Sequence, residues 1–599
     1  MKKNHIFSAI ILGLASFALV SCLPFDDPVD DLRPSEVMQD DVVLQGEADH
    51  IDYTVVPTQQ GLDSALLRID TYLSGTMTGQ KGMKGGKEGG YPVEHSYQLM
   101  MTLADVYAGY AVIPHYDFAY GSNIISSYQI SDSWYKGANG QFSLVKNSFA
   151  PFLNHPDVDS IPEMKALLLL LLDFVSVEET DNYGPFPYAD YKANKTDNPF
   201  TYNKMEDIYN TVKDNIDTIQ ACFRYFGQKP QWYRDRIQQL LYKNVVISRD
   251  QANGIQGFET WRRLANSLKL RMAMHMVKVD PDKARQWAEE AVRDGVIESH
   301  ENEVGMYPND YGGSHPLQTI SCTWGDERLN ASFESLMMSL DHPMTRMLFN
   351  RNSDALMNVK TNTVSLEANT KIVGIRSGLH VGQGQSYGSN QYIGFSQPNP
   401  NFIGQLPLYI MKWCEVDFLR AEGALRGWNM GGTAQSFYER GIDNSSPFDP
   451  QNTALGIGYS NLLQAYKQLA EARPYTYQDP TGNSDDIESV TTIGVAWNEA
   501  DDPETKLEKI ITQKYLAGYP NSYEAWVDVR RTGYPKLFPV LNVEDGDGSL
   551  KEGDMVRRMI FPNTDDASLK EIQETGLPAL GGPDQQATRL WWDVDAPNF

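Results

Sequence analysis

The 599-residue sequence has few residues of the types that bind metals or act as catalytic nucleophiles. It contains four cysteines and ten histidines, and no pair of cysteines has the CxxC spacing of a metal site. Since Cys22 belongs to an N-terminal motif described below, three cysteines remain and at least one is unpaired, which argues against a disulfide framework. No HExxH motif is present either. We therefore expect no metal, no cofactor and no catalytic residue.

Positive charge and long apolar runs are also scarce. The sequence has 51 Lys and Arg against 78 Asp and Glu, a formal net charge of -27. Binding to nucleic acid needs clustered cations that neutralise phosphates, so this balance argues against a nucleic-acid partner. The run of six leucines within 161–174 is far shorter than the roughly 20 apolar residues of a membrane span. It predicts a buried core helix.

The N-terminus has the pattern of an export signal. Lys2 and Lys3 precede an apolar stretch, and residues 1–21 read as a signal peptide. Leu-Val-Ser before Cys22 resembles a bacterial lipobox, which predicts lipidation of Cys22; the alternative is an ordinary signal peptide followed by a chance cysteine. Residues 22–45 are acidic and proline-containing, and read as a lipidated tether, either simply solvated or acting as a signal for export to the cell surface.

Helical periodicity is clearest in 259–295. Apolar residues recur there at helical spacing, and Asp280-Pro281 then ends one helix and starts another with Asp280 as its N-cap. A stripe of alanines follows up to Gly295, which predicts two closely packed antiparallel helices of tetratricopeptide type. The alternative is a single helical hairpin in an ordinary core. Hairpins are predicted within 205–295 and 412–446.

Between the helices lie stretches rich in Tyr, Trp, Asn, Asp and Gly, which predict loops at 115–140, 300–407 and 535–599, with possible short strands at 372–375 and 391–395. Aromatic rings beside carboxylates and amides suit a carbohydrate ligand, because rings stack on the apolar faces of sugars while the polar groups bind hydroxyls. The alternative is that each ring fixes its loop to the core. The candidate ligand-binding residues are Tyr116, Tyr120, Trp134, Tyr311, Trp324, Tyr387 and Tyr392.

Six further segments follow the lipobox in a defined order: DNYGPFPYAD (181–190), WRRLANSLKLRMAM (261–274), KWCEVDFLRAEGALRGW (412–428), YERGIDNS (438–445), IITQKYLAGYPNSYEAWVDVRRTGYPKL (510–537) and RRMIFP (557–562). Together they resemble the SusD/RagB family of Bacteroidetes outer-membrane lipoproteins. Pro185 departs from the family's usual Asp in its turn. Physically, Arg530, Arg531 and Glu422 within these segments read as internal ion-pair or helix-cap residues.

The resemblance implies a mainly α fold of tetratricopeptide-like hairpins with an irregular loop-rich subdomain, occupying 46–599. It implies a lipid-anchored protein on the outer membrane, facing outward, that binds an oligosaccharide without cleaving it. It also implies a partner, a SusC-like TonB-dependent transporter that imports the glycan. Three alternatives remain at this point: a cell-surface glycoside hydrolase, a binding protein for peptides or other oligomers, and a repeat scaffold that binds only protein.

Overall fold

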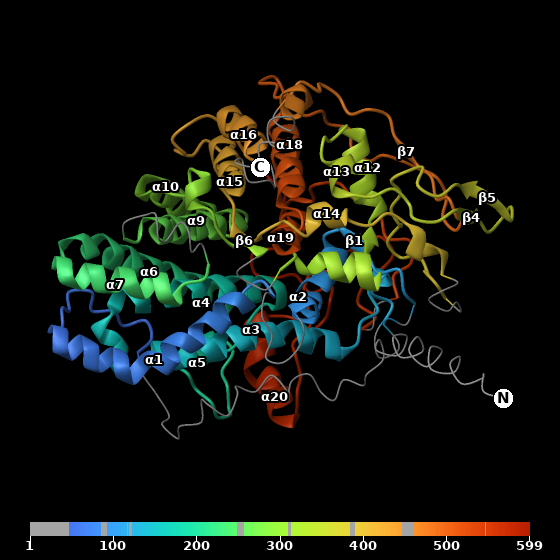
Figure 1. The fold of residues 1–599 in the computed structure, drawn as a ribbon. Coiled ribbons are helices and arrows are strands. Elements are labelled where there is room, and N and C mark those ends of the chain that lie inside the picture. Colours follow the sequence, from blue (N-terminus) through green and yellow to red (C-terminus); the bar gives the residue numbers. More distant parts are fainter. Residues whose placement is uncertain are drawn as a thin grey trace, which may run out of the picture.

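The computed structural model of the protein describes residues 47–85, 93–116, 118, 123–247, 257–308, 313–383, 390–445, 461–544 and 547–599 (Figure 1). The predicted signal peptide, Cys22 and the acidic tether lie outside these residues. Within the described ranges, no helix is both long enough and apolar enough to cross a membrane.

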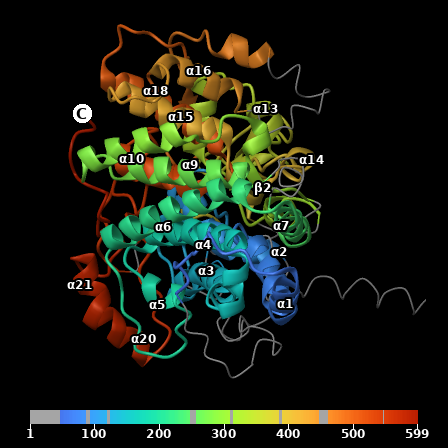
Figure 2. The same ribbon diagram turned by 90° about the vertical axis from the view of Figure 1, so that its left-hand side faces the viewer.

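The fold is mainly α, as predicted, and its body is a stack of packed helix pairs (Figure 2). The pairs are α1 (Gln59–Gly82) with α3 (Asp132–Leu153), α4 (Pro162–Tyr183) with α6 (Met205–Tyr225), α9 (Glu259–His275) with α10 (Pro281–Asp294), and α15 (Trp413–Leu425) with α16 (Ala434–Asp443). Contacts of α3 with α4, of α6 with α9 and of α9 with α15 join the pairs into one continuous core.

Other helices complete this body and its surroundings. They are α2 (Val93–Tyr107), α5 (Tyr188–Lys192), α7 (Gln231–Asn244), α12 (Ala331–Ser339), α13 (Thr345–Leu348), α14 (Pro400–Ile403), α18 (Pro503–Gly518), α19 (Ser522–Thr532), α20 (Asp566–Glu571) and α21 (Leu577–Leu580). The six leucines at 167–172 are fully buried in α4, which confirms the predicted core helix.

The α9–α10 hairpin forms as its sequence predicts. The apolar face of α9, with Trp261, Leu264 and Leu268, is completely buried. The Asp280 side chain caps α10 by accepting a hydrogen bond from the Lys283 backbone N–H at 3.1 Å. The helix ends at Asp294, and Gly295 follows as its C-cap with a φ of +96°, a conformation that favours glycine.

The loop-rich region packs beside this body and contains the short strands (Figure 1). In the described residues they form two-stranded antiparallel pairs: β1 (Ala111–Val112) with β3 (Arg328–Leu329), β2 (Val304–Met306) with β6 (Leu408–Met411), β4 (Leu356–Asn358) with β5 (Thr363–Leu366), and β7 (Thr476–Tyr477) with β8 (Ile487–Glu488).

Two local predictions for this region are wrong. Residues 391–394 form a 3₁₀ helix and not a strand, because the Asn390 side chain accepts from the Tyr392 N–H and so caps a helical turn. At 372–375 no strand forms: Ile375 makes a single parallel bridge with Asn330, and the Val373 carbonyl accepts a hydrogen bond from the Ser396 N–H at 3.0 Å.

The loop predicted for 115–140 is also wrong from Asp132 onward, where α3 begins. Gly137 and Gly140 lower the helix propensity of this stretch by roughly 1 kcal/mol each. The packing of α3 against α2 explains why residue 137 is a glycine, because a Cβ there would lie 2.8 Å from Leu99 Cδ2 of α2. The glycine therefore permits a close approach of two helices instead of marking a loop.

Candidate functional site

The β1–β3 pair brings together segments that are more than 200 residues apart in the sequence. Ala111 pairs with Leu329 and Val112 with Arg328, so the chain that follows β1 lies beside the chain that precedes β3. Asp326 is the meeting point. Its Oδ1 lies 3.4 Å from His115 Nε2, and its Oδ2 accepts from Gln98 Nε2 of α2 at 2.8 Å.

Aromatic rings surround this junction. The indole of Trp324 stacks on the His95 ring, with centroids 4.7 Å apart and planes at 28°. Phe118 stacks between His115 at 5.5 Å and Trp134 at 5.6 Å. The ring of Tyr116 meets His380 edge-on at 6.0 Å. We call the partly exposed rings of His95, Tyr116, Phe118, Trp324 and His380 the aromatic surface.

Polar groups line the same surface. Gln383 Nε2 donates to the Tyr116 hydroxyl at 3.3 Å, and His380 Nε2 contacts the Glu544 carboxylate. Near Trp324, the Thr319 hydroxyl donates to Glu94 Oε1 at 3.4 Å. Flat rings beside amide and carboxylate groups can bind a ligand that has both apolar faces and hydroxyls.

Electrostatics favour neutral stacking at the Trp324 end. Burial lowers the pKa of His95 below its usual value, although the nearby Glu94 and Asp326 carboxylates partly oppose this shift. His95 is therefore a neutral ring at pH 7. Together with the indole it forms an uncharged platform, and the negative charge lies at its edge in Asp326 and Glu94.

The structure separates the predicted site residues into three groups. Tyr116 and Trp324 belong to the aromatic surface. Trp134 is 5% exposed within α3 and Tyr392 is 4% exposed, so both serve as packing residues and neither presents a ring face to a ligand. The Tyr392 hydroxyl lies 3.4 Å from that of Thr481 inside the loop-rich region. The others, Tyr120, Tyr311 and Tyr387, lie outside the described residues.

Sequence reasoning missed His95, His115, Phe118 and Asp326. A choice of Tyr and Trp residues in loop-like stretches excludes them, because His95 occupies the first turn of α2 and Asp326 follows a short π-helix, η6 (Gln318–Trp324). No spacing in the sequence signals their proximity, because the Gln98–Asp326 contact spans 228 positions.

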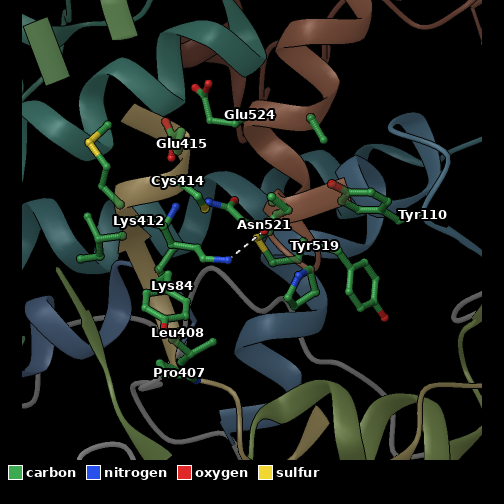
Figure 3. A pocket seen from close by; sticks show the side chains of 18 of the residues that line it. Lys84, Tyr110, Pro407, Leu408, Lys412, Cys414, Glu415, Tyr519, Asn521 and Glu524 are labelled. Carbon is green, nitrogen blue, oxygen red and sulfur yellow. Dashed lines mark hydrogen bonds between the residues drawn. The ribbon is translucent and has the colours of Figure 1, made fainter. Parts of the chain in front are cut away.

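A second candidate lies inside the body, among Lys84, Tyr110, Lys412, Glu415 and Glu524 (Figure 3). This cavity measures about 60 Å³. Ligand pockets usually hold about 300–1,000 Å³, so the space suits a few waters and no saccharide. Its charged walls are already paired: Lys84 with Glu178, and Lys514 with both Glu524 at 3.0 Å and Asp528 at 2.9 Å. It is part of the ionic core.

Comparison with known proteins places this geometry in context. The SusD-like family model, described as SusD and RagB outer membrane lipoprotein, matches residues 67–593. A search of curated proteins finds no match.

Solved structures resemble the chain over most of its length. A chitin-binding SusD homolog from Flavobacterium johnsoniae is 31% identical, with a TM-score of 0.72 over 88% of this chain and 100% of its own. SusD homologs from Bacteroides ovatus and Bacteroides vulgatus are 27% and 25% identical; the alignments cover 88% and 89% of this chain and 99% and 100% of theirs, with TM-scores of 0.69 and 0.72. Because the family model matches most of the chain and a relative aligns along it at 31% identity, the chain belongs to the SusD-like family of SusD and RagB outer membrane lipoproteins.

Proposed function

We propose that the protein binds an oligosaccharide on its aromatic surface without cleaving it. The observation that carries the proposal is the stacked Trp324–His95 platform beside Asp326, Gln98 and Glu94. Such a platform matches the amphipathic character of a pyranose ring, whose apolar face stacks on aromatic side chains and whose hydroxyls bind carboxylates and amides.

The relatives support a particular ligand class. A 31% identical family member is described as chitin-binding. Chitin is a neutral β-linked polymer of N-acetylglucosamine, and a neutral ring platform with acceptor groups at its edge suits such a ligand. We propose neutral glycans of this kind as the first ligands to test.

The wider setting is also part of the proposal. Residues 1–21 are removed as a signal peptide, Cys22 is lipidated, and 22–45 tether the domain of 46–599 to the outer membrane, facing outward. The domain then passes its glycan to a SusC-like TonB-dependent transporter. This arrangement rests on the lipobox and on family membership.

The test is affinity electrophoresis of the purified protein against a panel of soluble neutral and acidic glycans, with reducing ends assayed in parallel. We expect retardation by at least one neutral glycan and no release of reducing sugar. Steady release of reducing ends would favour a glycoside hydrolase, and retardation by none of the panel, with binding of peptides instead, would favour the peptide-binding alternative.

A further inference from the structure

The carboxylates of the aromatic surface are paired differently from those of the helical body. Inside the body, a carboxylate such as Glu422 is held by Arg531. At the aromatic surface, Asp326, Glu94 and Glu544 form no ion pair with a lysine or arginine of the described residues. The negative charge of this surface is therefore not cancelled by a permanent cation of the fold.

The sequence explains this lack of cations. Four segments carry the rings and carboxylates of the aromatic surface, and none of them contains a lysine or an arginine: 93–118, 313–327, 377–383 and 537–550. Such long stretches without a basic residue leave the surface with acids as its charged groups. A ligand that approaches it meets a negative potential.

Two arginines flank these segments and both turn inward. Arg328 is 4% exposed, and its guanidinium donates to the carbonyls of Ile393 and Ser321 at 2.8 and 3.0 Å. Arg376 is also 4% exposed and donates to the Pro539 carbonyl at 3.0 Å. Their charges are thus directed into the fold, away from a ligand at the surface.

At the Trp324 end, two carboxylates lie close to the ring platform. Glu94 and Asp326 are both near enough to the His95 ring, which stacks on Trp324, to oppose the lowering of its pKa by burial. The Asp326 side chain is 18% exposed and that of Glu94 is half-buried, so a ligand on the platform can reach both.

The hydrogen-bond donors at these two carboxylates include uncharged groups. Asp326 Oδ2 accepts from the Gln98 amide at 2.8 Å, and Glu94 Oε1 accepts from the Thr319 hydroxyl at 3.4 Å. A carboxylate has about four lone-pair sites, so each keeps acceptor capacity for a ligand.

The Tyr116 end repeats the arrangement of a ring beside a carboxylate. The Tyr116 ring meets that of His380 edge-on, and His380 Nε2 contacts the Glu544 carboxylate. The Glu544 side chain is 36% exposed and can also accept a hydrogen bond from a ligand. Both ends of the aromatic surface therefore offer a ring and an accessible carboxylate.

This combination suits a positively charged group better than a neutral or negative one. An ammonium group is attracted by the faces of aromatic rings, and its hydrogen bonds to carboxylates are roughly twice as strong as those between neutral partners. A sugar carboxylate or sulfate would meet charges of its own sign.

We propose that the aromatic surface prefers glycans with free amino groups, namely β-linked glucosamine oligomers, over neutral and acidic glycans. The preference rests on the proposed function, because it concerns the ligand class of the same site. Ring stacking holds a neutral or an amino sugar alike. Asp326, Glu94 and Glu544 then accept hydrogen bonds from the ammonium groups of the amino sugar, which binds more tightly.

The test is isothermal titration of the purified protein at pH 6, where sugar amines are protonated. The ligands are a chitin oligomer, its fully deacetylated form and an oligogalacturonate, all of one length. We expect the deacetylated oligomer to bind about three- to ten-fold more tightly than the acetylated one, and the oligogalacturonate to bind least. The preference should shrink as salt is raised, because salt screens exposed charges.

An oligolysine of equal charge tests whether positive charge alone is enough. It carries the ammonium groups without the sugar rings, so we expect it to bind at least about ten-fold more weakly than the deacetylated oligomer. Equally tight binding of oligolysine would overturn the proposal, since the surface would then attract any cation.

Variants assign the preference to the named carboxylates. We expect Asp326→Asn and Glu94→Gln each to lower the ratio of the two affinities, deacetylated over acetylated, about two- to three-fold. Both changes keep the size of the side chain and an acceptor oxygen. Glu574→Gln is the control, because Glu574 is 61% exposed, pairs with Lys570 and contributes the same charge to the chain. If the control lowered the ratio as much, the preference would come from the net charge and the proposal would be overturned.

The preference and the proposed function can fail separately. If both oligomers bind with equal affinity, or the acetylated one binds more tightly, the preference is refuted and glycan binding stands. If neither oligomer nor any other glycan binds, both are refuted. Trp324→Ala should weaken both oligomers; unchanged binding of the deacetylated oligomer would place it elsewhere on the chain and overturn the preference as a property of the aromatic surface.

Discussion

Arg531 of α19 and Glu422 of α15 form a bidentate ion pair inside the helical body. Arg531 Nη1 donates to Glu422 Oε1 at 2.9 Å and Nη2 to Oε2 at 2.7 Å, and the two side chains are 3% and 1% exposed. Burial alone would raise the pKa of Glu422, but Arg531 and Arg426 outweigh it and lower the pKa to about 2. The internal ion pair predicted from the sequence is therefore confirmed, and it joins two segments 109 positions apart.

Removing the charge of Glu422 should destabilise the fold. We expect Glu422→Gln to lower the free energy of unfolding by about 3–5 kcal/mol, because it removes the carboxylate that pairs with the buried Arg426 and leaves the buried Arg531 with Asp528 alone. Denaturant unfolding at pH 7 measures this loss. Glu574→Gln is the control, since Glu574 is 61% exposed. A loss of less than about 1 kcal/mol in Glu422→Gln would contradict the account.

His275 should remain charged well above its ordinary range. Burial lowers its pKa, but Glu524 Oε1 and Asp181 Oδ2, each 3.1 Å from a ring nitrogen, raise it overall to about 9. Because the folded-state pKa is raised, this stabilisation is complete below about pH 6.5 and is lost as the pH rises through 9. We expect unfolding free energies of the wild type to fall across that window, and His275→Gln to show a flatter profile. If the unfolding free energies of the wild type and of His275→Gln fell equally steeply with pH, the raised pKa of His275 would be refuted.

Asp105 and Glu327 are buried carboxyls that form no ion pair with any cation of the described residues. Their pH dependence is therefore opposite to that of an acid paired with a cation. Burial raises the pKa of Asp105 to about 7, and that of Glu327 rises as well because of burial and the proximity of Asp105. The neutral forms are favoured in the fold, so this stability is present below about pH 4 and is lost as the pH rises through 7. Asp105→Asn should therefore stabilise the protein at pH 8, by about 1–3 kcal/mol, and change little at pH 4. Thermal unfolding of the wild type and of Asp105→Asn at both pH values measures this difference. If Asp105→Asn were less stable than the wild type at pH 8, the fold would need the charged carboxylate of Asp105.

The anchor prediction concerns Cys22. Replacing it with Ser should leave the protein without acyl chains. The variant should then lack the membrane affinity that acyl chains confer. We expect Cys22→Ser to be recovered in the soluble fraction, whereas Cys222→Ser, at a buried core cysteine, should stay in the membrane fraction. Normal membrane recovery of Cys22→Ser would contradict lipidation.

Periodic, locally encoded features were predictable from the sequence. The α9–α10 hairpin follows from apolar spacing, from the Asp280 cap and from Gly295, all of which act within a few residues. The start of α3 was not predictable in this way, because Gly137 weakens the helix locally and is explained only by the neighbouring Leu99. Local propensity was overruled there by packing.

The candidate site was only half predictable for a related reason. Tyr116 and Trp324 could be chosen as aromatic residues in loop-like stretches. Their partners His95 and Asp326 could not, since these residues meet only because the β1–β3 pairing brings distant segments together. The burial of Trp134 likewise follows from α3 and not from the composition around it.

The most direct test of the account is isothermal titration of the purified protein with a glycan that retards it in electrophoresis, such as a chitin oligosaccharide. The comparison is between the wild type, Trp324→Ala and Tyr242→Ala, whose ring is 55% exposed on α7 away from the aromatic surface. We predict that Trp324→Ala weakens binding about three- to ten-fold or more, as loss of ring stacking requires, and that Tyr242→Ala binds like the wild type. Equal affinities for all three proteins would contradict the central claim that the aromatic surface is where the glycan binds.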